Sequence, residues 1–264
     1  MPLFEKIEAF TNVSVGLQWA MFIVGALIVV VALVSVAISL WLMVRYIKFN
    51  RRKNSAGITG SEAARKILDE NGLNHIKVSV VGSFIFGNSY SHYFKKIRLR
   101  RLTNKKPSIA SLAMGAQKSA LAIMDKEGDK DMKTRVAFTP VIYFGPVAFI
   151  PIIVIGALID FILLKGTGVV TIACAVLGLL LYVVSFVMSI MVLKTEVKAQ
   201  KKACEILLKD NLATNEEIES MQELFKLYNI EYVNNIILEF LEMIMRVLSL
   251  IAKLQSKESF GNND

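Results

Sequence analysis

The feature that most constrains this chain is a long run without a charged side chain, between Glu8 and Arg45. Its apolar part, residues 13–44, exceeds the ~20 residues that a helix needs to cross a hydrocarbon core of ~30 Å. A cleaved signal peptide carries its basic residues before a shorter apolar run, whereas here a basic cluster follows the run. We therefore expect an uncleaved transmembrane helix over 13–44, with residues 1–12 outside the cell.

Two further apolar segments, 136–160 and 169–193, predict a second and a third transmembrane helix. They form a hairpin around the short turn 165–168. The second helix should be bent and packed against neighbours, because each proline inside a helix deletes a backbone hydrogen bond. Three of the five prolines of the chain lie in it, namely Pro140, Pro146 and Pro151.

A fourth apolar segment, 229–252, is interrupted by charged residues: Glu231, Glu239, Glu242 and Arg246. A charge at the bilayer centre costs ~2.5–3.5 kcal/mol on insertion scales. The segment therefore either faces a protein interior as a fourth transmembrane helix or lies in the membrane interface. We favour the spanning alternative, with 253–264 as a polar tail.

The basic residues predict the orientation of these helices. Residues 45–135 hold 20 Lys and Arg against 7 Asp and Glu, and the segment 194–228 is also rich in lysine. Positively charged loops stay on the cytoplasmic side of a membrane. Both segments should therefore be cytoplasmic, and 194–228 should be helical.

The segment 45–135 contains the helix-capping and strand patterns of a folded domain. Thr59 and Glu62 form a capping box that opens a helix over 60–71. Alternating residues in 75–81 and 96–102 predict two strands, and a second helix runs from Pro107 and Ser108 to Lys126. The predicted fold class is a mainly α membrane protein. Three to four transmembrane helices carry a small α+β cytoplasmic domain inserted between the first and the second.

Several stretches, in order along most of the chain, resemble the bacterial membrane-bound neutral zinc metallopeptidase (YugP-like) family. The opening motif of that family matches residues 58–73, just after the first helix, and its zinc helix matches 107–125. Shorter matches are Ser91-His92-Tyr93-Phe94 with the strand after it, residues 195–199, and residues 230–233. This resemblance implies a membrane-bound metallopeptidase fold.

The resemblance also implies a zinc motif that this chain lacks. The family carries His-Glu-x-x-His on its zinc helix, where two histidines four residues apart bind the metal and the glutamate activates water. An ungapped alignment places Gln117, Lys118 and Leu121 at these three positions. Leucine has no lone pair, glutamine is a poor zinc ligand, and lysine is a cation where a carboxylate is required.

Glu196 stands where the resemblance puts the third zinc ligand. A single charged residue has low specificity, so a solvated or salt-bridged glutamate on a helix rich in lysine is the simpler interpretation. If Glu196 is buried, something must neutralise it. We then expect Lys118 or a neighbouring basic side chain to pair with it and Leu121 to fill the remaining space.

The other metal-binding residue types give no second site. His75, His92, Cys174 and Cys204 show no ligand spacing, and His92 is expected to serve in local packing or hydrogen bonding. No cofactor is expected here, whereas the resemblance implies zinc in active relatives. Serines of the second predicted helix have no histidine within sequence reach, so a serine hydrolase is not motivated; they are Ser108, Ser111 and Ser119.

Taken together, these features predict a catalytically inactive relative of a bacterial cell-membrane metallopeptidase that acts as a scaffold, regulator or binding partner for membrane proteins. An active metallopeptidase with non-standard ligands is one alternative. The other is an electrostatic binder, because the predicted strand presents cations that could contact a peptide or anionic lipid: Lys96, Arg98, Arg100 and Arg101. We favour lipid over nucleic acid, since no nucleic-acid motif is present.

Overall fold

The computed structural model describes residues 13–81, 87–164 and 166–261. Its contacts divide the chain into two compact units, each built from separate stretches of sequence. The first, here called the apolar unit, comprises Met1–Val36, Pro140–Val187 and Asn234–Asp264. The second, here called the α5 unit, comprises Ala37–Thr139 and Met188–Val233. The predicted external segment 1–12 lies outside the described residues.

Two helices are long and apolar enough to cross a membrane: α2 (Val15–Arg51) and α7 (Val169–Lys209). The proline-containing helix α6 (Lys130–Leu163) is bent, as its sequence predicts, and adds a third span only if its two parts are taken as one. The fourth predicted span lies inside α8 (Asn215–Gly261), which does not qualify among the described residues. The reason is physical, since the apolar stretch of α8 is interrupted by the charged residues noted above.

Within the apolar unit, small residues bring α6 and α7 together. Gly156 leaves no room for a Cβ beside Cys174, and Gly145 leaves none beside Ser185. Asp160, near the end of α6, is buried and accepts hydrogen bonds from the backbone and hydroxyl groups at the start of α7, including the Thr171 N–H at 2.6 Å. These contacts close the predicted hairpin.

The α5 unit begins with α3 (Gly60–Glu70), which the capping box of Thr59 and Glu62 opens as predicted. The Thr59 side chain accepts from the Glu62 N–H, and the Glu62 carboxylate accepts from the Thr59 N–H. Gly72 follows the helix with a φ of 65°, the left-handed conformation that commonly ends helices. Local sequence therefore determines both ends of α3.

The sheet of the α5 unit has three strands in the order β1-β3-β2. They are β1 (Lys77–Val81), β2 (Ser89–Ser91) and β3 (Lys96–Arg100). The predicted second strand ends earlier than expected, because helix α4 (Arg101–Lys105) begins at Arg101.

The position of β3 corrects one prediction. It is the central strand, parallel to β1 and antiparallel to β2. Strand β1 pairs along the whole of β3, and β2 pairs with Lys96, Ile97 and Arg98 on the other side. The strand is therefore not a free edge for the predicted peptide contact.

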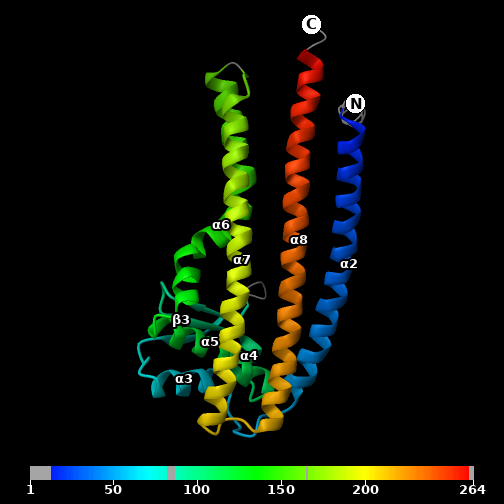
Figure 1. Ribbon diagram of the computed structural model, residues 1–264. Coiled ribbons are helices and arrows are strands. Elements are labelled where there is room, and N and C mark those ends of the chain that lie inside the picture. The colour runs from blue at the N-terminus through cyan, green and yellow to red at the C-terminus, as the bar shows by residue number, and fades with distance from the viewer. Residues whose placement is uncertain (1–12, 82–86, 165, 262–264) are drawn as a thin grey trace. The chain divides into compact units, whose positions relative to one another are not determined.

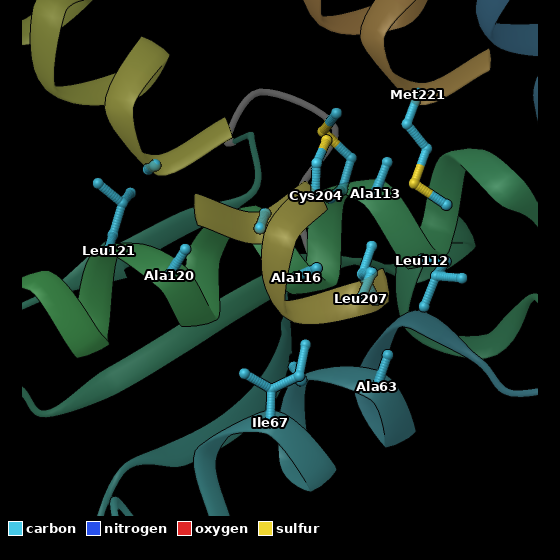
Figure 2. Packing of buried hydrophobic residues seen from close by; sticks show 14 of the residues in the cluster. Ala63, Ile67, Leu112, Ala113, Ala116, Ala120, Leu121, Cys204, Leu207 and Met221 are labelled. Carbon is cyan, nitrogen blue, oxygen red and sulfur yellow. The ribbon is translucent and has the colours of Figure 1, made fainter. Parts of the chain in front are cut away.

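Helix α5 (Ile109–Lys126) is the centre of its unit and opens on Ser108, as predicted. Every residue from Ile109 to Met124 is buried, so neighbours surround the helix on all sides. Its core partners come from α3, the end of α7 and the start of α8 (Figure 1). Figure 2 shows Ala116 of α5 beside Leu207, with Ile67 of α3 below them.

Two glycines set the distance between α3 and α5. A Cβ on Gly115 would lie well inside van der Waals contact with the Gly60 carbonyl oxygen. A Cβ on Gly60 would clash in the same way with the Thr103 carbonyl oxygen. Both obstacles are backbone atoms, which cannot rotate away, so the backbones of α3 and α5 meet directly at this crossing.

Changing Gly115 to alanine is therefore expected to destabilise the α5 unit. Overpacking typically lowers the free energy of unfolding by ~1–3 kcal/mol. We expect a loss of ~3 kcal/mol here, because the neighbouring atom belongs to the backbone and cannot move aside. Thermal unfolding of the detergent-solubilised protein should show a melting temperature lower by ~6–12 °C. Gly87→Ala is the control, because a Cβ at Gly87 meets nothing within 4 Å. Equal melting temperatures for the two variants would contradict the close crossing.

Candidate site at the Glu196 carboxylate

Glu196 lies on the part of α7 that belongs to the α5 unit, beyond the apolar stretch of that helix. Its side chain is only 15% exposed. Thr195 and Ala199, on the same helix, are completely buried. The α7 surface around Glu196 is therefore packed into the core, and a carboxylate placed there must be compensated by its partners.

Two residues of the central helix α5 reach Glu196. Gln117 Nε2 donates a hydrogen bond to Glu196 Oε2 at 2.8 Å. Lys118 Nζ lies 3.0 Å from the same oxygen, and the Lys118 side chain is only 10% exposed. The predicted ion pair between Lys118 and Glu196 is therefore present.

A second cation holds the other oxygen of the carboxylate. Arg135, near the start of α6, places Nη1 2.7 Å from Glu196 Oε1, and its side chain is 18% exposed. Glu196 is thus enclosed by one amide and two cations that come from two different helices. We call Gln117, Lys118, Arg135 and Glu196 the Glu196 cluster.

The Glu196 cluster determines the ionisation state of its carboxylate. Burial alone would raise the pKa of Glu196, because it disfavours the charged form. The charges of Lys118 and Arg135 outweigh that effect and lower the pKa of Glu196 to about 2, from 4.5. The carboxylate is therefore ionised at every physiological pH, and it is a weak general base at neutral pH because its pKa is so low.

This lowered pKa predicts how stability depends on pH. A carboxyl group whose pKa is lower in the folded state stabilises the protein above the unfolded pKa. That contribution should be complete above about pH 4.5 and be lost as the pH falls toward about 2. Melting temperatures of the wild type and of Glu196→Gln, measured between pH 7 and pH 3, should converge at acidic pH. Other carboxylates titrate in both proteins, so a constant difference between the two curves would contradict the prediction.

A neighbouring ion-pair group joins the same two helices. Asp131 of α6 is buried, and its carboxylate pairs with Lys198 and with Lys194, the latter at 3.0 Å. Hydrogen bonds from Lys198 and Lys194 lower the pKa of Asp131. Asp131 and Arg135 are four residues apart on α6 and face opposite charges on α7.

The sequence analysis missed Arg135 as a partner of Glu196. A signal was present, since Asp131 and Arg135 are spaced by four before one predicted helix, and Glu196 lies between Lys194 and Lys198 after the next. Such alternating charges can pair when the two helices form a hairpin.

Leu121 is the residue that the resemblance aligns with the second family histidine. It is completely buried and belongs to the hydrophobic core of the α5 unit. Figure 2 shows it beside Ala120 on α5. A hydrocarbon side chain therefore lies at the position that the resemblance aligns with a zinc ligand.

The remaining metal-binding residue types are not gathered around Glu196. In the part of the chain that the structure describes, no three His, Cys, Asp or Glu side chains are placed to hold a metal ion. Cys174 and Cys204 are both free thiols, and they belong to different units. His92 fulfils its predicted hydrogen-bonding role, with Nδ1 2.6 Å from Asp125 Oδ2.

The serines of α5 have structural partners. Ser108 caps the helix by accepting from the Ser111 N–H, and Ser119 donates to backbone carbonyls of Gly115 and Ala64. All three serines are buried.

The basic residues of the predicted strand are not part of the Glu196 cluster. Arg98 and Arg100 point away from the core on β3, Arg101 opens α4, and all three are exposed, whereas Lys96 is half-buried. Arg98 lies 5.6 Å from the centre of the Phe94 ring.

Comparison with known proteins places most of the chain in one family. A family model described as "Putative neutral zinc metallopeptidase" matches residues 22–252. A protein of Bacillus subtilis (strain 168), described as "Putative membrane protease YugP", is 24% identical over 204 residues, which cover 76% of this chain and 84% of that protein. No solved structure matches the chain significantly. The family match includes all of α5 and the Glu196 cluster.

Proposed function

Because this chain belongs to the neutral zinc metallopeptidase family, we propose that it is a catalytically inactive member whose zinc site has been replaced by the Glu196 cluster. The observation that carries this proposal is the enclosure of Glu196 by Lys118 and Arg135 at 3.0 and 2.7 Å. Two cations supply two positive charges, the charge of Zn²⁺. The carboxylate is thereby neutralised by protein side chains.

The donor set of the cluster does not fit zinc. Zinc in proteins prefers imidazole, thiolate and carboxylate ligands in a tetrahedral arrangement. Here Glu196 is the one carboxylate, Gln117 offers an amide, and an ammonium and a guanidinium repel a dication. A metal-bound water at this place would also lack the carboxylate base that the family motif provides.

We further propose that the protein is a cell-membrane scaffold, regulator or binding partner for other membrane proteins. In this proposal the α5 unit lies in the cytoplasm, as the excess of Lys and Arg in 45–135 favours. Its exposed cations, including Arg98, Arg100 and Arg101, would then contact anionic headgroups. The exposed apolar side chains of α2 are compatible with lipid contact.

Metal analysis of the purified protein, combined with a proteolysis assay, tests this function. The wild type is expected to contain less than stoichiometric zinc after size exclusion and to leave casein and a peptide library uncleaved with added Zn²⁺. The Bacillus subtilis relative, purified in the same detergent, serves as the comparison for metal content and cleavage.

One result would overturn the proposal in favour of an active metallopeptidase with non-standard ligands. It is tightly bound, stoichiometric zinc together with proteolysis that a chelator stops and Glu196→Ala abolishes. Proteolysis that survives Glu196→Ala and chelator would instead indicate a contaminating protease, because it would depend on neither the cluster nor a metal.

A further inference from the structure

A second polar site lies in the α5 unit, away from the Glu196 cluster. It is a cavity of about 190 Å³ between the end of α3, the turn between β2 and β3, and the last turns of α5. Asp125 on its wall is seven residues beyond Lys118 on α5, or ~10 Å along the helix axis. A cavity of this size holds a small polyatomic anion with a few waters, but no peptide or base pair.

Asp125 organises one wall of the cavity. Its Oδ2 accepts a hydrogen bond from the Tyr90 hydroxyl at 2.6 Å and lies 2.6 Å from His92 Nδ1. Burial would raise the pKa of Asp125, but these hydrogen bonds and the charges nearby lower it. With an ionised carboxylate as its partner, His92 Nδ1 carries a proton, which fixes the orientation of the imidazole ring.

Lys95 is held at the mouth of the cavity by an uncommon backbone conformation. Its φ of 44° lies in the left-handed region, which is sparsely populated by residues other than glycine. Its Nζ is 3.7 Å from Asp125 Oδ2 and 3.3 Å from His92 Nδ1. Because His92 Nδ1 is already a donor, it cannot accept from Lys95, so the ammonium retains hydrogen-bond donors for another acceptor.

Further cationic or ionisable groups complete the lining. Lys126 donates one hydrogen bond to the Asn71 carbonyl oxygen at 2.6 Å, which leaves two of its three donors. His75 also lines the cavity. Two ammonium groups and two imidazoles thus face a single carboxylate, and that carboxylate is engaged by Tyr90 and His92.

From this arrangement we infer that the cavity binds a phosphate group, either as inorganic phosphate or as a phosphomonoester. Lysine acts as a point charge that suits the oxygens of a phosphate, and both Lys95 and Lys126 line the cavity. The two ammonium groups outnumber the one carboxylate, so the lining carries a net positive charge that favours an anion. The site is independent of the Glu196 cluster and so does not depend on the proposed loss of catalysis.

Calorimetric titration of the full chain in detergent micelles, at constant ionic strength, tests this inference with three probes: inorganic phosphate, glycerol phosphate and dihexanoyl phosphatidic acid. The wild type should bind at least one of them saturably with one site per chain. Lys95→Asn should weaken binding by about tenfold or more, the loss expected for one charge-assisted hydrogen bond. Asparagine is chosen because it tolerates the left-handed backbone.

Lys77→Gln is the matched control, because Lys77 is exposed on the neighbouring strand, carries the same charge and does not line the cavity. Its affinity should equal that of the wild type. Lys126→Gln provides a second variant if Lys95→Asn does not fold. Binding of inorganic phosphate or glycerol phosphate would support a site for a free phosphate compound. Binding of dihexanoyl phosphatidic acid alone would support a site for the phosphate of a lipid headgroup. No saturable binding of any probe, or equal weakening by Lys77→Gln, would overturn the inference.

Discussion

Replacing Glu196 with alanine is expected to lower the free energy of unfolding by ~3–5 kcal/mol, the cost of removing one partner from a buried ion pair. The substitution leaves Lys118 and Arg135, at 10% and 18% side-chain exposure, without their shared carboxylate. The two cations then repel each other at a site from which water is largely excluded. Thermal and denaturant unfolding in detergent should both report the loss.

Glu216→Ala is the matched control for this prediction. Glu216 pairs with Arg52 at 2.9 Å, but the Glu216 side chain is 78% exposed. Exposed pairs contribute ~0–1 kcal/mol, so this variant should remain close to the wild type. If the two alanine variants unfolded alike, Glu196 would be a solvated surface residue and the cluster would have no structural role.

Lys118→Met should destabilise the protein much less than Glu196→Ala, because Arg135 remains to neutralise the carboxylate. The methionine also keeps most of the side-chain volume in the buried position. This asymmetry distinguishes a carboxylate shared by two cations from a simple pair, in which removing either partner is comparably costly.

Local patterns in the sequence were sufficient to predict the elements around the site. The capping box of Thr59 and Glu62 and the Ser108 cap each place a helix start correctly, since capping depends on residues three positions apart. The pair between Lys118 and Glu196 was also predictable once Glu196 was assumed to be buried. That assumption came from the family resemblance and not from the charge pattern.

Features that depend on long-range pairing were not predictable from such patterns. Alternation in residues 96–102 predicts a strand but not its place in the sheet, and β3 proved to be central. The pairing of Arg135 with Glu196 joins residues that are distant in sequence on α6 and α7. Whether residues 229–252 span a membrane depends on how the charges of α8 are compensated, and hydropathy alone does not determine that.

In the proposed loss of the zinc site, the Glu196 cluster links the three departures from the family motif to one another. With Gln117 and Leu121 at the positions aligned with the two histidines, a buried Glu196 would have no metal to neutralise it. Lys118, at the position aligned with the catalytic glutamate, supplies a cation at 3.0 Å. Reversing only one of the three changes would therefore leave either an unpaired charge or an incomplete ligand set. Zinc binding should return only when all three are reversed together.

The triple variant Gln117→His, Lys118→Glu and Leu121→His is accordingly expected to bind one Zn²⁺ per chain with a Kd of about 1 µM or tighter. The two imidazoles would lie four residues apart on α5, and Glu196 would supply a carboxylate. Adding Arg135→Gln should tighten binding further, since Arg135 Nη1 otherwise holds Glu196 Oε1 at 2.7 Å. Competition with a chromophoric chelator measures these affinities.

The control retains Gln117→His and Lys118→Glu but carries Leu121→Ala, which removes the second imidazole. It should bind zinc at least about 100-fold more weakly, because a site with one histidine and one carboxylate lacks the three protein ligands of a catalytic zinc site. Equal affinities for the triple variant and this control would show that position 121 does not face the metal. Leu121 is completely buried in the core, so the imidazole introduced by Leu121→His would be a buried polar ring that a bound zinc ion compensates. The stability of the triple variant should therefore also rise when zinc is added.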